Sequence, residues 1–141
     1  MTTAQISTDQ GRLDVPLIYQ FLSEQSTWAV GMPRALLERA IANSLCFGVY
    51  LDGRQIGFAR VVTDCATFAN LVDVFVLPAP RGQGHSKRLM EAIVAHPDLQ
   101  GLRRFTLATG DAHGLYAQFG FTPPLLPATL MERYCPDVYR N

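Results

Sequence analysis

The sequence predicts a mixed α/β fold in which one mostly antiparallel sheet carries helices on both faces. Two helical patterns precede the first strand-like segment, and Asp52-Gly53 then joins two strand-like segments as a tight hairpin would. A strand-helix-strand pattern at residues 71–108 predicts a right-handed parallel crossover. The 141 residues fit one domain, spanning residues 1–141, and nothing in the chain suggests a division.

The two N-terminal helices are predicted from apolar residues at helical spacing. Asp14 is placed to cap the first helix, and Pro33 opens the second. A loop at residues 26–32 separates them and contains Trp28, the single tryptophan. The apolar stripes that define the two helices are Leu17, Ile18, Phe21 and Leu22, followed by Leu36, Leu37, Ala40 and Ile41.

Strands alternate with helices through the rest of the chain. The expected elements are strands at 46–51, 55–62 and 71–77, a helix beginning near residue 84, and a strand at 104–108. A short helix follows, capped by Asp111, ending at Phe119 and stopped by Gly120. The tail is interrupted by prolines, and one or two closing strands fit it.

Composition narrows the functional classes. Acidic and basic residues balance at 12 each, so the chain lacks the basic excess of a nucleic-acid binder. The three cysteines are widely spaced, which indicates neither a metal site nor a disulfide framework and favours a reducing, cytoplasmic compartment. No signal peptide or apolar run of about 20 residues is present, so we expect no membrane association.

The junction between residues 77 and 88 carries the strongest chemical signal. An apolar strand runs into the loop Arg81-Gly82-Gln83-Gly84, and a helix begins there. Small residues and free N–H groups at a helix start favour a bound phosphate, and Arg81, Lys87 and Arg88 add positive charge. The glycine patterns of P-loop and Rossmann nucleotide sites are absent. A tight strand-to-helix turn with a solvated basic flank explains the same residues equally well.

Two sequence blocks resemble the GNAT superfamily of N-acetyltransferases. The stretch Val76-Leu77-Pro78-Ala79-Pro80-Arg81-Gly82-Gln83-Gly84-His85-Ser86-Lys87 resembles its signature, which is Arg or Gln, two residues, Gly, one residue, then Gly or Ala. Arg81 and Gly84 match, whereas Ser86 departs at the last position. Residues 112–121 resemble the block Ala-x-x-Leu-Tyr-x-x-x-Gly-Phe, although Thr109 stands where the family often has asparagine.

The resemblance implies a GNAT-like fold whose central parallel strand pair splits to admit acetyl-CoA. It implies direct acetyl transfer, without a covalent enzyme intermediate, to a primary amine on a small molecule or peptide. Formation of a homodimer is a habit of the family. The residues expected to bind the cofactor are Phe75, Val76 and Leu77 for the pantetheine arm, and Arg81, Gly82, Gln83, Gly84, His85, Ser86 and Lys87 for the pyrophosphate.

Two side chains are expected to perform the chemistry. Tyr116 can give a proton or a hydrogen bond to the departing thiolate, or it serves only as a packing residue. Asp73 lies in an apolar strand, where a carboxylate is costly unless it is paired or faces a cleft. It can accept the proton of the attacking amine, or it can pair with a loop N–H or with an arginine such as Arg60. Strand alternation places Asp73, Phe75 and Leu77 on one face, opposite Val72, Val74 and Val76.

Three further residues are assigned around these. His113, one turn before Tyr116, contacts the cofactor or relays a proton, or lies on the surface. Trp28 and Tyr19 come from the segment that lines the acceptor pocket in the family. Two alternatives to an enzyme stay open: an acyl-CoA-binding or sensing module without transferase activity, and an interaction domain that binds another anion.

Overall fold

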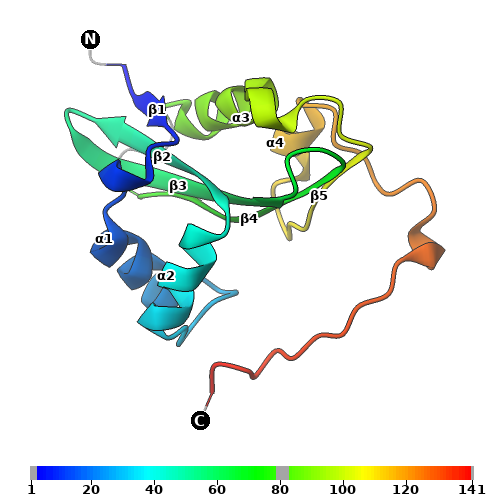
Figure 1. The fold of residues 1–141 in the computed structure, drawn as a ribbon, viewed down its shortest axis with the longest axis horizontal. Helices are drawn as coiled ribbons and strands as arrows, with labels where there is room; N and C mark the ends of the chain where they lie inside the picture. The colour runs from blue at the N-terminus through cyan, green and yellow to red at the C-terminus, as the bar shows by residue number, and fades with distance from the viewer. Residues whose placement is uncertain (1–2, 79–82, 141) are drawn as a thin grey trace.

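The computed structural model describes residues 3–78 and 83–140, which form one five-stranded sheet with helices on both faces (Figure 1). The strand order is β1-β2-β3-β4-β5. Neighbours are antiparallel from β1 to β4, whereas β4 and β5 are parallel, which confirms the predicted crossover. The strands are β1 (Gln5–Ser7), β2 (Leu45–Leu51), β3 (Arg54–Thr63), β4 (Phe68–Val76) and β5 (Arg104–Leu107).

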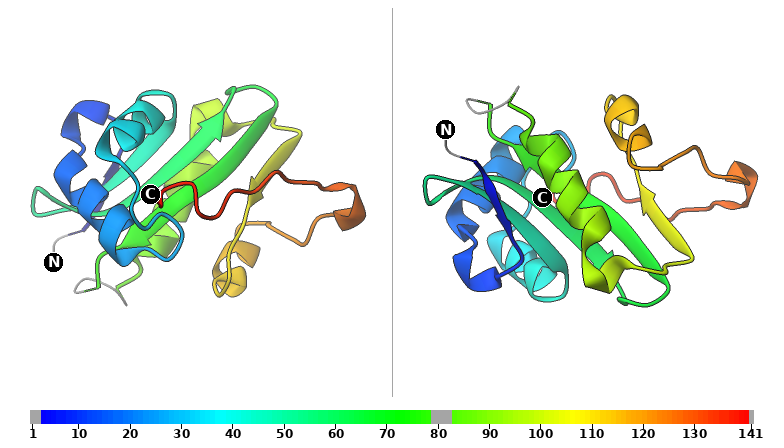
Figure 2. Two further views of the ribbon diagram at one scale, coloured as in Figure 1. Left: turned by 90° about the horizontal axis from the view of Figure 1, so that it is seen from below. Right: turned by 90° about the horizontal axis from the view of Figure 1, so that it is seen from above.

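Helices α1 and α2 cover one face of the sheet, and α3 covers the other (Figures 1 and 2). The helices are α1 (Val15–Gln20), α2 (Arg34–Ala42), α3 (His85–Ala95) and α4 (His113–Ala117), with a π turn at Phe21–Gln25 and single 3-10 turns at Gln10–Arg12, Pro97–Leu99 and Pro127–Thr129. Two apolar clusters result. The α3-side cluster is centred on Phe47, Val49, Val61, Leu89, Met90 and Ile93. The α1–α2-side cluster is centred on Ile18, Leu22, Leu37, Ile41, Phe58 and Phe75.

The N-terminal half forms as its sequence predicts. The Asp14 carboxylate accepts a hydrogen bond from the Leu17 N–H at 3.1 Å and caps α1, and Pro33 immediately precedes α2. In the hairpin, Asp52 and Gly53 both have positive φ, at 52° and 78°. A type I′ turn requires that conformation at both central positions.

Three expectations for the C-terminal half are wrong in part. The N-cap position of α4 is Ala112, not Asp111, and the Ala112 N–H donates to the Thr109 hydroxyl at 3.0 Å in the turn before the helix. Gly120 does stop this segment, with a φ of 89°. No strand follows β5 in the described part of the chain, so the parallel pair lies at one end of the sheet instead of its centre. Strand β1 was not expected, because three residues carry too short a pattern to detect.

The closing segment stands away from the body. Residues 122–138, which we call the C-terminal arm, are exposed along their whole length. The arm leaves the body after Phe121 and follows a wide arc in Figure 1. Tyr139 then packs beside the α1–α2-side cluster, with its backbone close to Gly31.

Candidate functional site

Strands β4 and β5 part halfway along β4. Their pairing runs from Phe68 opposite Arg104 to Leu71 opposite Leu107, and the Thr106 hydroxyl donates to the Asn70 side chain near its end at 2.8 Å. Beyond this point β4 continues to Val76 without a strand beside it on that edge in the described part of the sheet. The two strands diverge toward their C-terminal ends in Figure 2. We call the region along this edge of β4, beyond its pairing with β5, the β4 gap.

A β-bulge at Asp73 lies where the gap begins. Ala59 of β3 faces both Asp73 and Val74, since its neighbours Phe58 and Arg60 pair with Phe75 and Val72. Asp73 adopts a φ of 55°, a left-handed conformation in which aspartate and asparagine are favoured over most residues. Such a bulge bends the strand and re-aims its side chains.

The bulge shifts the alternation of β4. Leu71 and Val74 both pack on the α3 side, whereas Phe75 and Leu77 pack on the α1–α2 side. The expected placement of Asp73 with Phe75 and Leu77 agrees with its contacts described below. Val72 precedes the bulge, so its side chain lies opposite Leu71, on the side of Phe75, and the expectation for Val72 was wrong.

Backbone groups of two β4 residues face the gap. The Leu77 N–H donates to the Ile56 carbonyl of β3 at 2.8 Å, so this residue directs its polar groups away from the gap. Successive residues of a strand direct these groups to opposite sides. Val74 and Val76 therefore direct theirs toward the gap, and Phe75 and Leu77 do not.

The Asp73 side chain joins two layers of the fold. It is buried, and one oxygen accepts a hydrogen bond from the Trp28 indole N–H at 2.8 Å. The other forms an ion pair with Arg60 at 3.0 Å. Arg60 also donates to the Ser44 hydroxyl at 3.1 Å. The arginine partner that the sequence suggested for Asp73 is confirmed, and Trp28, which is half exposed, is brought to the same carboxylate.

Tyr116 lies on the other side of the sheet. Its ring is buried in the α3-side cluster and meets the Phe121 ring edge-on, with 6.1 Å between centroids. Burial, and to a lesser extent the Asp111 carboxylate, raises the pKa of the Tyr116 phenol. A phenol with a raised pKa stays protonated through neutral pH and can donate a hydrogen bond. The structure therefore places Tyr116 and Asp73 on opposite faces of the sheet.

The start of α3 offers backbone donors. Gly84 precedes the helix with a φ of 80°, and no side chain caps it. The first internal bond of the helix runs from the Arg88 N–H to the Gly84 carbonyl, so the N–H groups of His85, Ser86 and Lys87 lie in the open first turn. Gln83 and Lys87 are exposed. Arg81 and Gly82, which were assigned to the pyrophosphate, lie outside the described residues.

His85 adds a feature that sequence reasoning missed. Its imidazole is buried, and neither ring nitrogen has a hydrogen-bond partner among the described residues. Buried polar atoms are normally satisfied by hydrogen bonds, so this ring is a natural contact for a ligand at the start of α3. The sequence did offer one sign of this contact: a histidine stands within a loop whose backbone N–H groups were expected to bind the phosphate.

The remaining assigned residues are more peripheral. His113 is the first residue of α4 and is exposed. Tyr19 is half buried beside the α1–α2-side cluster, and its carbonyl accepts the Ser23 hydroxyl at 2.7 Å. Phe75 and Val76 are buried, and the Phe75 ring stacks on Phe21 with 4.0 Å between centroids.

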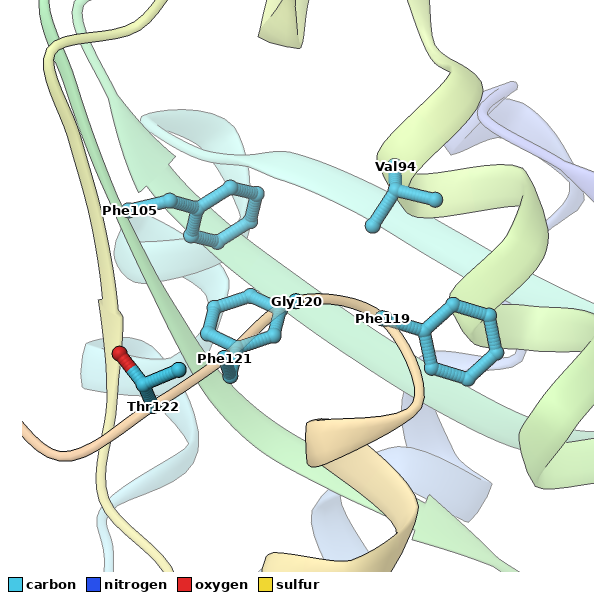
Figure 3. A pocket seen from close by; sticks show the side chains of 6 residues that line it. All are labelled: Val94, Phe105, Phe119, Gly120, Phe121 and Thr122. Carbon is cyan, nitrogen blue, oxygen red and sulfur yellow. The ribbon is translucent and has the colours of Figure 1, made fainter.

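Two surface cavities accompany the gap. One, of about 300 Å³, is bordered by the rings of Phe105, Phe119 and Phe121 between β5, α4 and α3 (Figure 3). The other, of about 330 Å³, lies between Arg12, Arg54 and Leu77. Within the described residues, no group of acidic, histidine or cysteine side chains is arranged to hold a metal ion, and no helix is long and apolar enough to cross a membrane.

Comparisons with known proteins agree with this geometry. A family model described as an acetyltransferase (GNAT) domain matches residues 42–123. A candidate acetyltransferase from Gibberella zeae is 32% identical over 135 residues, covering 80% of this chain and 75% of that protein.

Solved structures give the same fold. A candidate GNAT-family acetyltransferase from Xanthomonas campestris pv. campestris is 61% identical, covers 100% of this chain and 99% of its own, and superposes with a TM-score of 0.97. A predicted acetyltransferase from Clostridium acetobutylicum, crystallised with acetyl-CoA, shares the fold with a TM-score of 0.66 at 11% identity over 95% of this chain and 96% of its own.

Proposed function

This chain belongs to the GNAT acetyltransferase family, and from that premise we propose that it transfers an acetyl group from acetyl-CoA to a primary amine by direct attack. The parting of β4 and β5 carries the proposal. Beyond the parting, β4 has no strand beside it on that edge in the described sheet, and the Tyr116 phenol lies on one face of the sheet and the Asp73 carboxylate on the other.

The described residues suit an acyl-CoA ligand in three ways. Val74 directs its backbone groups into the gap, where an extended amide chain can pair with them as a strand would. The open first turn of α3 presents N–H groups and positive helix-dipole charge to a phosphate. The buried His85 ring lies in that turn, and its two nitrogens have no hydrogen-bond partner in the part of the chain that the structure describes.

Acetyl-CoA supplies an activated thioester when bound, and the protein must manage two protons around it. Tyr116 donates a proton or hydrogen bond to the sulfur as the carbon–sulfur bond breaks, which its raised pKa permits at neutral pH. Asp73 receives the proton that the amine loses, directly or through water. Trp28 and Arg60 hold the carboxylate in one orientation.

The acceptor reaches the gap from the α1–α2 side in this proposal. Trp28 is half exposed and bonded to Asp73, so its indole face can contact the acceptor while its N–H fixes the carboxylate. Tyr19 lies on the same side of the sheet. The acceptor is a small molecule or peptide that carries a primary amine.

Thiol release from acetyl-CoA, measured against a panel of primary amines, tests the proposal. We expect Tyr116→Phe to lower kcat by about 100-fold while retaining cofactor binding. Tyr50→Phe is the matched control, because the Tyr50 hydroxyl is also buried and has no partner in the described structure. Cofactor binding without thiol release from any amine would favour the acyl-CoA-binding alternative, and equal loss in both variants would remove Tyr116 from the mechanism.

A further inference from the structure

The cavity between Arg12, Arg54 and Leu77 takes no part in the proposed acetyl transfer. It has a volume of about 330 Å³ and is lined from the 3-10 turn before α1, the start of α1, the β2–β3 hairpin and the end of β4. We call it the arginine cavity. The lining residues that determine its chemistry are Arg12, Asp14, Leu17, Tyr50, Arg54 and Leu77.

Two guanidinium groups border this cavity without a counter-charge. Within residues 3–78 and 83–140, no carboxylate forms an ion pair with Arg12 or Arg54. Asp14 is the one acidic residue of the lining, and its carboxylate already accepts the Leu17 N–H at 3.1 Å. Two arginines and one aspartate leave the lining with a net charge of +1. One carboxylate would balance that charge, whereas a phosphate monoester, with a charge of nearly −2, would leave negative charge beside Asp14.

The Arg12 side chain is held in place over an aromatic ring. Its guanidinium lies over Tyr50, with 4.2 Å between Cζ and the ring centroid. This cation–π contact uses no hydrogen-bond acceptor, so the N–H groups of the guanidinium remain available for an anion. The Tyr50 ring lies back along β2 over Gly48, where any side chain would collide with the Tyr50 hydroxyl. The turn that carries Arg12 is anchored as well, because the Gln10 amide donates to the Ile41 carbonyl at 2.8 Å.

A buried amide fixes the opposite wall of the cavity. Arg54 begins β3 directly after the tight turn of the hairpin, and its neighbour Gln55 is buried. The Gln55 oxygen accepts the Asp14 N–H at 2.7 Å, and its amide nitrogen donates to the Gly57 carbonyl at 3.0 Å. These bonds join β3 to the start of α1, so the two arginines are supported by a preformed frame. Such preorganisation lowers the entropy lost when a ligand binds.

The arginine cavity is separate from the reacting groups. Leu77, which lines it, lies four residues beyond Asp73, or about 13 Å along an extended strand. Between them on the same side of the sheet, the Phe75 ring stacks on Phe21 with 4.0 Å between centroids. Tyr116 lies on the other side of the sheet. A ligand in the cavity therefore does not reach the residues proposed for acetyl transfer.

We propose that the arginine cavity binds a small carboxylic acid with an apolar body. The carboxylate lies between Arg12 and Arg54, each of which can pair with it through two N–H groups. The apolar part of the ligand lies against Leu17 and Leu77. A volume of about 330 Å³ is small for a ligand site, so the acid has the size of one aromatic ring or a short aliphatic chain. This binding is independent of the proposed acetyl transfer.

Calorimetric titration of the full chain with phenylacetate tests the site. We expect a Kd of about 0.1–1 mM, and about tenfold weaker binding in Arg12→Gln and in Arg54→Gln, because each variant loses one charge-assisted contact. 2-Phenylethanol has a similar body without the charge and should not bind. Phenyl phosphate should bind more weakly than phenylacetate because of Asp14. Arg104→Gln, exposed on β5 at the edge of the sheet, removes the same charge and should bind phenylacetate as the wild type does.

Competition with CoA then separates the arginine cavity from the cofactor site. Saturating CoA should leave the phenylacetate Kd unchanged. Absence of saturable binding at millimolar phenylacetate, wild-type binding in both cavity variants, or equal weakening in Arg104→Gln would overturn the proposal. Tighter binding of phenyl phosphate, binding of 2-phenylethanol, or displacement of phenylacetate by CoA would overturn it as well. Thiol release from acetyl-CoA is measured separately, so failure here is distinguishable from failure of the proposed transferase activity.

Discussion

Replacing Asp73 by asparagine should weaken the protein markedly, although asparagine fits the site in shape. Asparagine tolerates the φ of 55° and keeps an oxygen for the Trp28 N–H, so backbone strain and that hydrogen bond change little. The charge opposite Arg60 is lost. The side chains of Asp73 and Arg60 are only 5% and 15% exposed, so the guanidinium is left largely buried without its counter-charge.

The magnitude follows from the ion-pair geometry. At a separation of 3.0 Å, the attraction between the two charges is about 5 kcal/mol at an effective dielectric constant of about 20. Relief of the Asp73 desolvation and the remaining Ser44 contact of Arg60 offset part of this. Because removal of one partner of a buried pair typically costs about 3–5 kcal/mol and Arg60 keeps some solvent contact, we expect a loss of about 2–3 kcal/mol in unfolding free energy.

Urea denaturation followed by the fluorescence of Trp28 measures the effect, since this single tryptophan donates directly to Asp73. Arg60→Leu and the Asp73→Asn, Arg60→Leu double variant complete a double-mutant cycle, with an expected coupling of about 2 kcal/mol. Asp73→Ala should cost about 1 kcal/mol more than Asp73→Asn, because alanine resists positive φ. A coupling below about 0.5 kcal/mol would refute the assignment of a structural ion pair at the bulge.

Two other substitutions test the anion site at the start of α3 and the burial of the Cys46 thiol. Gly84→Asp should weaken CoA binding about tenfold, or about 1.4 kcal/mol, by calorimetry, because a carboxylate would face the anion site at α3. Gly101→Asp has similar strain, with a φ of 69° and open space, and should bind as the wild type does; equal weakening would argue against the site. Burial raises the pKa of the Cys46 thiol to about 11 from 9.0. The folded state therefore holds this proton more tightly than the unfolded state does. Between pH 9 and 11, the unfolding free energy of the wild type should fall by about 2 kcal/mol more than that of Cys46→Ala; parallel curves would contradict this.

The order of the elements could be read from local patterns. Asp14 and Pro33 start helices for local steric and hydrogen-bonding reasons, and Asp52-Gly53 suits one turn type. These features depend on residues that are close in sequence, so the rest of the fold changes their conformation little. The start of α4 was misplaced because Thr109 and Asp111 are both good acceptors within one loop, and the Thr109 hydroxyl forms a turn with the Asp111 and Ala112 N–H groups before the helix begins.

Contacts between distant residues were harder to predict. The bulge at Asp73 depends on pairing with β3, so strict alternation misplaced Val72. Trp28 was assigned to the acceptor and Asp73 to catalysis separately, and only the fold brings the indole to the carboxylate. Arg60 was suggested as a partner because a carboxylate in an apolar strand requires one. The arm was expected to close the sheet, yet its prolines and exposed leucines leave it away from the body.

Amide chemical shifts recorded during a CoA titration are the sharpest test of an acyl-CoA site in the β4 gap, because they show where the ligand lies. We expect the largest changes at Val74 and the first turn of α3, with smaller changes near Tyr116 and none in β1. No change at millimolar CoA, or changes confined to the cavity between Arg12 and Arg54, would contradict an acyl-CoA site in the β4 gap.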